Sequence, residues 1–198
     1  MSPRPDVSGE RRPQIIDAAI RVFSRNGYRK TTMPQIAREA RLSVGGVYWY
    51  FKNKEEIIGA ILTQLFQTDM QAMEILLNTD LPAGQRIRQF SDEYVEAYAH
   101  YAWLNKVGIE FYSDASHDEA VRHSIQKYLT QYRQALAALI AQGIQRGEFK
   151  PVDANDAANV VLGLDEGLSL LAVADPQGVD WSRSFRIGIE LLLTGIER

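Results

Sequence analysis

The stretch from Thr31 to Lys54 constrains the fold of this chain more than any other part of the sequence. Thr32 followed by Gln35 is a capping box, and Pro34 lies in the first turn of a helix, where its missing N–H would have no partner. Ser43 can cap a second short helix after a tight turn. The order of cap, helix, turn, cap and helix predicts a helix-turn-helix.

The second of these helices, predicted from Val44 to about Phe51, has an unusual composition. Gly45 and Gly46 open it, although each costs roughly 1 kcal/mol relative to alanine in a helix. A backbone without Cβ atoms can approach a rigid partner closely, and a helix N-terminus offers unpaired N–H groups to a phosphate. The alternative, a flexible loop followed by core aromatic residues, does not account for the ordered succession of caps.

The charge is distributed unevenly along the chain. Residues 1–54 contain 11 Lys or Arg and 4 Asp or Glu, whereas residues 55–198 contain 11 Lys or Arg and 21 Asp or Glu. The net charge of −3 therefore conceals a basic N-terminal part and an acidic C-terminal part. Neutralisation of phosphates supplies most of the sequence-independent affinity of a protein for DNA. The asymmetry therefore favours a DNA reader attached to a domain that does not bind DNA.

Apolar residues recur at helical spacing through the rest of the chain, and no segment shows a strand pattern. We expect an all-α protein of about nine helices: a disordered arm over 1–10, a three-helix helix-turn-helix DNA-binding domain over 11–54, and a helical ligand-binding and dimerisation domain over 55–198. The first helix is expected to begin near Pro13, and later helices to be capped by Asn53, Ser116, Asp153 and Asp180. Gly27 and Gly147 are expected to end two of the helices.

Other classes of protein are disfavoured. The apolar run Val160–Ala174 is interrupted by Asp165 and Glu166, no signal peptide is recognisable, and there is no cysteine, so a cytoplasmic protein is expected. The histidines form no metal-binding pair, and no catalytic motif occurs, so we expect neither an enzyme nor a cofactor. A helical adaptor or a small-molecule-binding protein without DNA regulation remains the alternative, and salt-dependent binding to duplex DNA would separate the two.

The N-terminal motifs resemble the DNA-binding domain of the tetracycline-repressor (TetR) family. The residues that carry the resemblance are Phe23, Gly27, Thr31-Thr32, Ile36-Ala37, Ala40, Ser43 and Val47-Tyr48-x-x-Phe51-x-x-Lys54-Glu55. The family usually has glycine in the turn where this chain has Arg41, so we expect either that Arg41 adopts a left-handed conformation at some cost or that the turn differs slightly. The resemblance implies a transcriptional regulator, a repressor released from a palindromic operator by a small hydrophobic or aromatic effector.

Local chemistry and the resemblance agree on the residues that face double-stranded DNA. We expect Tyr48, Tyr50 and Lys54 on phosphates, Thr32 and Ser43 in support, and Val44, Gly45, Gly46 and Trp49 against base edges.

A weaker resemblance covers the C-terminal part, where Arg133, Gly147-Glu148-Phe149, Asp153, Ala157 and Gly167-Leu168 are similar to the regulatory domain of betaine-type regulators in the same family. Tyrosines at core-facing positions need hydrogen-bond partners, which favours a ligand cavity over a dry core. The residues expected to line it are Phe66, Met70, Met73, Phe90, Tyr94, Tyr98, Trp103, Val107, Phe111, Tyr128, Tyr132, Asp165 and Leu168. Aromatic walls with carboxylates would suit a cation, whereas Arg86, Arg88, Lys106 and Arg133 would suit an anion or an acyl-CoA.

A homodimer is expected because one helix-turn-helix reads too few base pairs. Its interface should lie on the last two helices, because they carry more small and apolar residues than a single core-facing stripe needs. The expected interface residues are Val161, Gly163, Leu164, Gly167, Leu171, Ile187, Gly188 and Leu191. The alternative is that these residues are buried within one monomer.

Overall fold

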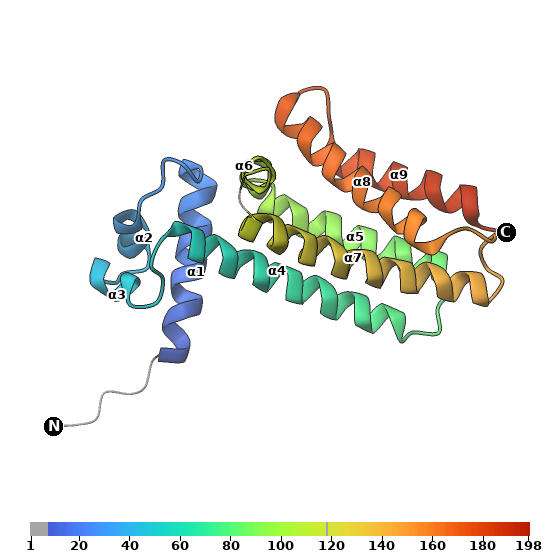
Figure 1. Cartoon of the computed structure of the whole chain (residues 1–198), viewed down its shortest axis with the longest axis horizontal. Helices are drawn as coiled ribbons and strands as arrows, with labels where there is room; N and C mark the ends of the chain where they lie inside the picture. The colour runs from blue at the N-terminus through green and yellow to red at the C-terminus, as the bar shows by residue number, and fades with distance from the viewer. Residues whose placement is uncertain (1–7, 118) are drawn as a thin grey trace. The chain divides into compact units, whose positions relative to one another are not determined.

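The computed structural model describes residues 8–117 and 119–198 and divides the chain into two compact units, up to Gln67 and from Thr68 onward (Figure 1). The described residues form nine α-helices and one isolated β-bridge, between Phe149 and Glu197. The all-α prediction is confirmed.

The first unit contains α1 (Ser8–Asn26), α2 (Met33–Glu39), α3 (Val44–Tyr48) and the start of α4 (Lys54–Leu77). Its core consists of apolar side chains from all four helices and from the segment between α3 and α4, among them Ile15, Phe23, Ile36, Val47, Phe51 and Ile57.

Three predicted boundaries in this unit differ from the structure. Helix α1 already begins at Ser8, so residues 8–10 are helical and the start predicted near Pro13 is wrong; residues 1–7 lie outside the described part. Helix α3 ends at Tyr48, and the backbone N–H of Phe51 still bonds to the Val47 carbonyl in the following turn. The division between compact units falls inside α4, not at Lys54, because α4 continues without a break from one unit into the other.

The second unit is a bundle of the remaining helices: the end of α4, α5 (Ala83–Tyr101), α6 (Leu104–Ala115), α7 (Glu119–Gln145), α8 (Ala154–Ala174) and α9 (Trp181–Ile196). Helix α7 packs on α8, and α8 packs side by side with α9 (Figure 1). Asp153 and Asp180 cap α8 and α9 through their carboxylates, as predicted. The cap predicted at Ser116 stays a prediction, because residue 118, directly before α7, lies outside the described part; the Ser116 hydroxyl donates a 2.6 Å hydrogen bond to the Ser113 carbonyl at the end of α6.

Helix α8 is unusually apolar for a helix of this bundle. Its length and its hydropathy of 1.5 would suffice to cross a membrane by these two criteria, yet only 17% of that window is buried within the described chain. Length and composition alone therefore do not exclude a spanning helix, contrary to the prediction. Asp165 and Glu166, in the middle of α8, accept hydrogen bonds from tyrosines of α5 and α6, so one face of the helix is built into the bundle.

Candidate functional site

The turn between α2 and α3 is closed by Arg41 in a left-handed conformation, with φ of 55°. The N–H of Leu42 bonds to the Ala37 carbonyl at 2.9 Å, and the N–H of Arg41 bonds to the Arg38 carbonyl at 3.1 Å. This pair of bonds is a Schellman motif, whose left-handed position is usually glycine. Of the two alternatives expected for Arg41, the left-handed conformation is confirmed.

The start of α3 is capped as predicted, because Ser43 Oγ accepts a hydrogen bond of 3.0 Å from the N–H of Gly46. The two glycines differ in their surroundings. A Cβ atom on Gly46 would lie 3.1 Å from that same Oγ, whereas a Cβ on Gly45 would meet no described atom within 4 Å. Packing within the described chain therefore explains why position 46 is glycine, but it does not explain glycine at position 45.

The outer face of α3 exposes large apolar and aromatic side chains. Trp49 is 84% exposed, and Val44 and Tyr48 are also exposed, while Val47 faces the core. We call Val44, Gly45, Tyr48 and Trp49 the α3 surface. Exposed single apolar residues are ordinary, whereas several large exposed apolar side chains on one short helix are a candidate binding surface.

The remaining DNA candidates flank this surface. Thr32 is exposed at the N-cap of α2, where its N–H bonds to Gln35 Oε1 at 2.9 Å. Tyr50 is half-buried. Lys54 is already engaged within the chain: its Nζ donates a 3.0 Å hydrogen bond to the Tyr28 carbonyl and lies 4.5 Å from the centroid of the Tyr28 ring. An ammonium has three donors, so donors remain for a phosphate.

Tyr28 is a part of this arrangement that the sequence reasoning missed. Its hydroxyl donates a 2.6 Å hydrogen bond to Glu55, and this bond is the main reason that the pKa of Glu55 lies below its usual value. The loop after α1 is thereby fastened to the start of α4 by two side chains, Lys54 and Glu55.

In the second unit, aromatic residues of α5 and α9 form one stack. The rings of Tyr98 and Trp181 are parallel with centroids 3.4 Å apart, and Trp181 is also parallel to Phe185 at 5.1 Å. Tyr94 contacts both Trp181 and Phe185, and Phe90 stacks on Tyr94. Trp181 and Phe185, which the sequence did not single out, therefore belong to one stack with three predicted ligand residues, Phe90, Tyr94 and Tyr98.

Beside this stack, three tyrosines each donate a hydrogen bond to a carboxylate. Tyr94 donates to Asp165 Oδ2 at 2.9 Å, Tyr112 donates to Glu166 Oε1 at 2.7 Å, and Tyr132 donates to Asp69 Oδ2. We call these six residues the tyrosine–carboxylate cluster. Only Tyr94, Tyr132 and Asp165 were predicted; the interruption of an apolar run by adjacent acids was the available signal for Glu166.

Burial shifts the titration of the cluster. Desolvation raises the pKa of Asp165 to about 7, with a further contribution from the neighbouring charge of Glu166, while the hydrogen bond from Tyr94 opposes the shift. Desolvation likewise raises the pKa of Asp69 and Glu166. Neutral and ionised forms of Asp165 are therefore both populated near neutral pH.

The other predicted ligand residues stay predictions. Phe66 belongs to the first compact unit, and the Phe111 side chain lies outside the described part. Met73 and Val107 are fully buried. The remaining predicted residues lie in the second unit, where they are Met70, Phe90, Tyr98, Trp103, Tyr128 and Leu168.

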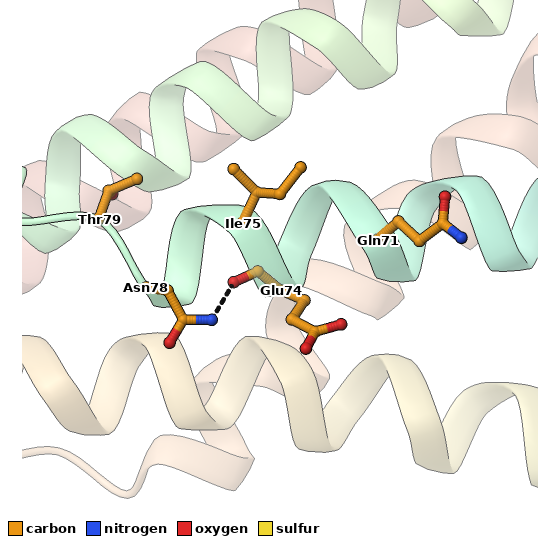
Figure 2. Close-up of a pocket in the computed structure, with 5 residues that line it drawn as sticks. All are labelled: Gln71, Glu74, Ile75, Asn78 and Thr79. Carbon is orange, nitrogen blue, oxygen red and sulfur yellow. Dashed lines mark hydrogen bonds between the residues drawn. The ribbon is translucent and has the colours of Figure 1, made fainter.

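Two surface hollows occur elsewhere in the second unit, and no predicted ligand residue lines either. One, of about 620 Å³, lies along the end of α4, where Asn78 Nδ2 bonds to the Glu74 carbonyl beside Gln71, Ile75 and Thr79 (Figure 2). The other, of about 320 Å³, lies between α5 and α9 and includes the predicted dimer residues Ile187 and Leu191.

The predicted dimer residues fall into two groups. Leu171, Ile187 and Leu191 are exposed, and Cβ atoms on Gly163 and Gly167 would meet no described atom within 4 Å. Val161 is buried, and a Cβ on Gly188 would collide with the side chain of Leu164 in the same chain. Gly188, Leu164 and Val161 thus serve the packing of the monomer, which corrects the prediction for them.

Both parts of the chain match known protein families. Residues 15–61 match the family described as bacterial regulatory proteins, tetR family, and residues 82–188 match the C-terminal family of BetI-type transcriptional repressors. The fatty acid metabolism regulator protein of Bacillus subtilis is 27% identical over 188 residues, covering 92% of this chain and 94% of that protein.

Solved structures share the fold. A TetR transcription regulator from Haloarcula marismortui has a TM-score of 0.82 at 23% identity, covering 96% of this chain and 100% of the other. The regulator FadR from Bacillus subtilis, solved in complex with stearoyl-CoA, has a TM-score of 0.76 at 26% identity, covering 93% and 99%. With both of its parts matched, the chain belongs to the TetR family of bacterial transcriptional regulators.

Proposed function

We propose that this protein is a cytoplasmic, ligand-responsive repressor that binds a palindromic operator as a homodimer and leaves it when a small hydrophobic or aromatic effector binds the second unit. The observation that carries the DNA half of the proposal is the α3 surface, where an 84% exposed Trp49 adjoins the open Gly45. Helix α3 of such a domain lies in the major groove, where close backbone approach is needed.

Charge supports the same orientation. The exposed side chains of Arg38, Arg41 and Lys52 lie on α2 and in the turns beside α3. Arg21 and Arg25, in contrast, are both bonded to Glu39 and are partly neutralised. Among the described residues, none of the first group is paired with a carboxylate, so we assign these three side chains to phosphates; an unpaired cation loses less when it binds DNA.

The dimer is proposed to form through the outer face of α8 and α9. Val160, Leu170, Leu171, Ile187 and Leu191 are all exposed there. A patch of this kind on a small protein usually marks an interface, and a second copy would bring two α3 helices to adjacent half-sites.

Coupling between effector and DNA is proposed to run through α4. This helix begins at Lys54, beside Tyr28, and also carries Asp69, which accepts a hydrogen bond from Tyr132 of α7. An effector that rearranges the tyrosine–carboxylate cluster would change how α4 is held, and the two ligands would then oppose each other by about 1–3 kcal/mol.

The test begins with selection of genomic fragments that the purified protein retains, followed by titration of a labelled duplex with the recovered site. We expect binding to that duplex at least about 1,000-fold tighter than to a scrambled duplex, with affinity that falls steeply with salt. Equal affinity for the two duplexes would contradict operator recognition. A ligand that raises the melting temperature but leaves operator affinity unchanged would contradict the regulatory half alone.

A further inference from the structure

The tyrosine–carboxylate cluster combines three acids with almost no compensating charge. Asp69, Asp165 and Glu166 accept hydrogen bonds from tyrosine hydroxyls, which are neutral donors. Among the described residues, the contributions that shift their pKa values come from tyrosines, Trp181 and one another, and none comes from Lys, Arg or His. Carboxylates taken out of water without a cation are costly and occur at functional sites.

The three acids act on one ring. Burial raises the pKa of Tyr128, and the charges of Asp165, Glu166 and Asp69 raise it further; its ring centroid lies 4.8 Å from that of Tyr132. Asp165 is in turn affected by both Glu166 and Asp69. The acids therefore share one local electrostatic field, at the place where α4, α7 and α8 bring them together.

One carboxylate oxygen of the cluster is not satisfied. Asp165 Oδ1 is buried and has no hydrogen-bond partner in the described part of the chain. The indole N–H of Trp181 is near enough to lower the pKa of Asp165, but it makes no hydrogen bond of normal geometry with the carboxylate. Buried acceptors are nearly always paired, so an unpaired carboxylate oxygen indicates a missing partner.

The arginines that could have made this an anion site are used elsewhere. Arg86 is buried and donates to the Leu76 carbonyl and Gln142. Arg88 is paired with Glu190 and Glu197, and Arg133 donates to Asn159. Of the four basic residues considered from the sequence, only Lys106 has no such assignment, and its side chain is exposed. The pairing of Arg86 and Arg88 within the chain therefore favours a cation over an acyl-CoA or another anion at this cluster.

We propose that the effector is an organic cation, an ammonium or amine group on an apolar body, whose charge is held by Asp165 with Asp69 and Glu166 beside it. The proposal rests on the proposed function, because it names the ligand class of the same unit. Aromatic rings border these carboxylates: Tyr94, which donates to Asp165, contacts Trp181, and Trp181 stacks on Tyr98. Aromatic rings attract a cation most strongly where water is excluded. The exposed Tyr112, bonded to Glu166, lies at the solvent edge of the cluster.

The test compares benzyltrimethylammonium with its uncharged carbon isostere, neopentylbenzene, and with the anionic dodecanoyl-CoA, by calorimetry on the full-length protein. We expect the cation to bind at least about tenfold tighter than the isostere, as for a desolvated cation on aromatic faces and a carboxylate. The preference should vanish in Asp165→Asn and persist in Glu96→Gln, which neutralises an exposed acid of α5.

The wild-type protein gives a second readout that does not depend on any variant folding. Because the ionised form of Asp165 binds the cation and its pKa is about 7, affinity should fall towards pH 6 and level off above pH 8. Equal affinity for cation and isostere, no detectable binding of the cation, tighter binding of dodecanoyl-CoA, or a cation preference that survives in Asp165→Asn would each overturn the proposal. None of these outcomes involves DNA, so they leave the test of operator binding independent.

Discussion

Ser43 Oγ accepts the hydrogen bond that caps α3 from the N–H of Gly46, and a Cβ atom on Gly46 would lie only 3.1 Å from that oxygen. The same small region therefore serves two purposes. It fixes the start of a five-residue helix, and it leaves the adjoining backbone without side-chain atoms, so that a partner can approach it closely. Substitutions there can be sorted by whether they change the fold, the approach of a partner, or both.

Arg41 gives a prediction about stability alone. A left-handed non-glycine residue costs about 1 kcal/mol, partly offset in Arg41→Gly by the greater freedom of glycine in the unfolded chain. We expect Arg41→Gly to raise the free energy of unfolding by a few tenths to about 1 kcal/mol in urea denaturation. Arg38→Gly, inside α2, should instead lower it by about 1 kcal/mol. A loss of stability in Arg41→Gly would contradict the assigned turn.

Lys54 gives a prediction about phosphate contact. Lys54→Gln keeps an N–H donor for the Tyr28 carbonyl but removes the charge, so the plot of log affinity against log salt should become shallower by about 1.8, which is about 0.9 for each of the two Lys54 side chains of the dimer. Lys150→Gln is the matched control, because Lys150 also bonds to a backbone carbonyl at 3.0 Å but lies in the second unit. Identical slopes for wild type and Lys54→Gln would show that Lys54 does not contact a DNA phosphate.

Leu191 tests the dimer face. It is 70% exposed on α9, so Leu191→Glu should cost the monomer little while placing a charge in the proposed interface. We expect sedimentation at micromolar concentration to show a monomer, with operator affinity reduced at least about tenfold. Ile75→Glu makes the same change at a 66% exposed position of α4 and should leave the dimer intact. Dissociation by both variants, or by neither, would speak against the α8 and α9 face.

Asp165 gives a prediction about pH and stability. Its folded-state pKa of about 7 lies above that of an unfolded aspartate, so the folded state binds more protons and loses stability as pH rises through 7. Besides burial, the groups that shift the pKa of Asp165 are Glu166, Tyr94, Trp181 and Asp69. The charge of Asp165 in turn raises the pKa values of Tyr112, Tyr128 and Tyr132. At pH 8, Asp165→Asn should stabilise the free protein by roughly 1–3 kcal/mol, and at pH 4 the difference should largely disappear. Equal stability at pH 8 would show that Asp165 is solvated.

Much of the first unit could be predicted because its signals are local. Caps such as Ser43, the stop at Gly27 and the left-handed Arg41 depend on neighbours within a few residues, and all three appear as expected. The boundaries that failed, at Ser8 and Tyr48, are helix ends at which no cap was recognised in the sequence.

The second unit was harder to predict because its site is assembled from distant segments. The pairing of Asp69 with Tyr132, or of Trp181 with Tyr98, cannot be inferred from helical spacing within one helix. The same holds for Gly188, which looked like a contact point for another chain and instead admits Leu164 of its own. Periodicity indicates which face of a helix is buried but not which helix covers it.

The central claim, that α3 is shaped by a partner that lies against its backbone, is tested most directly by Gly45→Ala. A Cβ at this position meets no atom of the described chain within 4 Å, and alanine favours a helix over glycine by up to about 1 kcal/mol. We therefore expect the variant to unfold at a higher urea concentration than wild type, yet to bind the operator duplex about tenfold or more weakly. Greater stability with unchanged operator affinity would contradict the assignment of α3 as the DNA-reading helix.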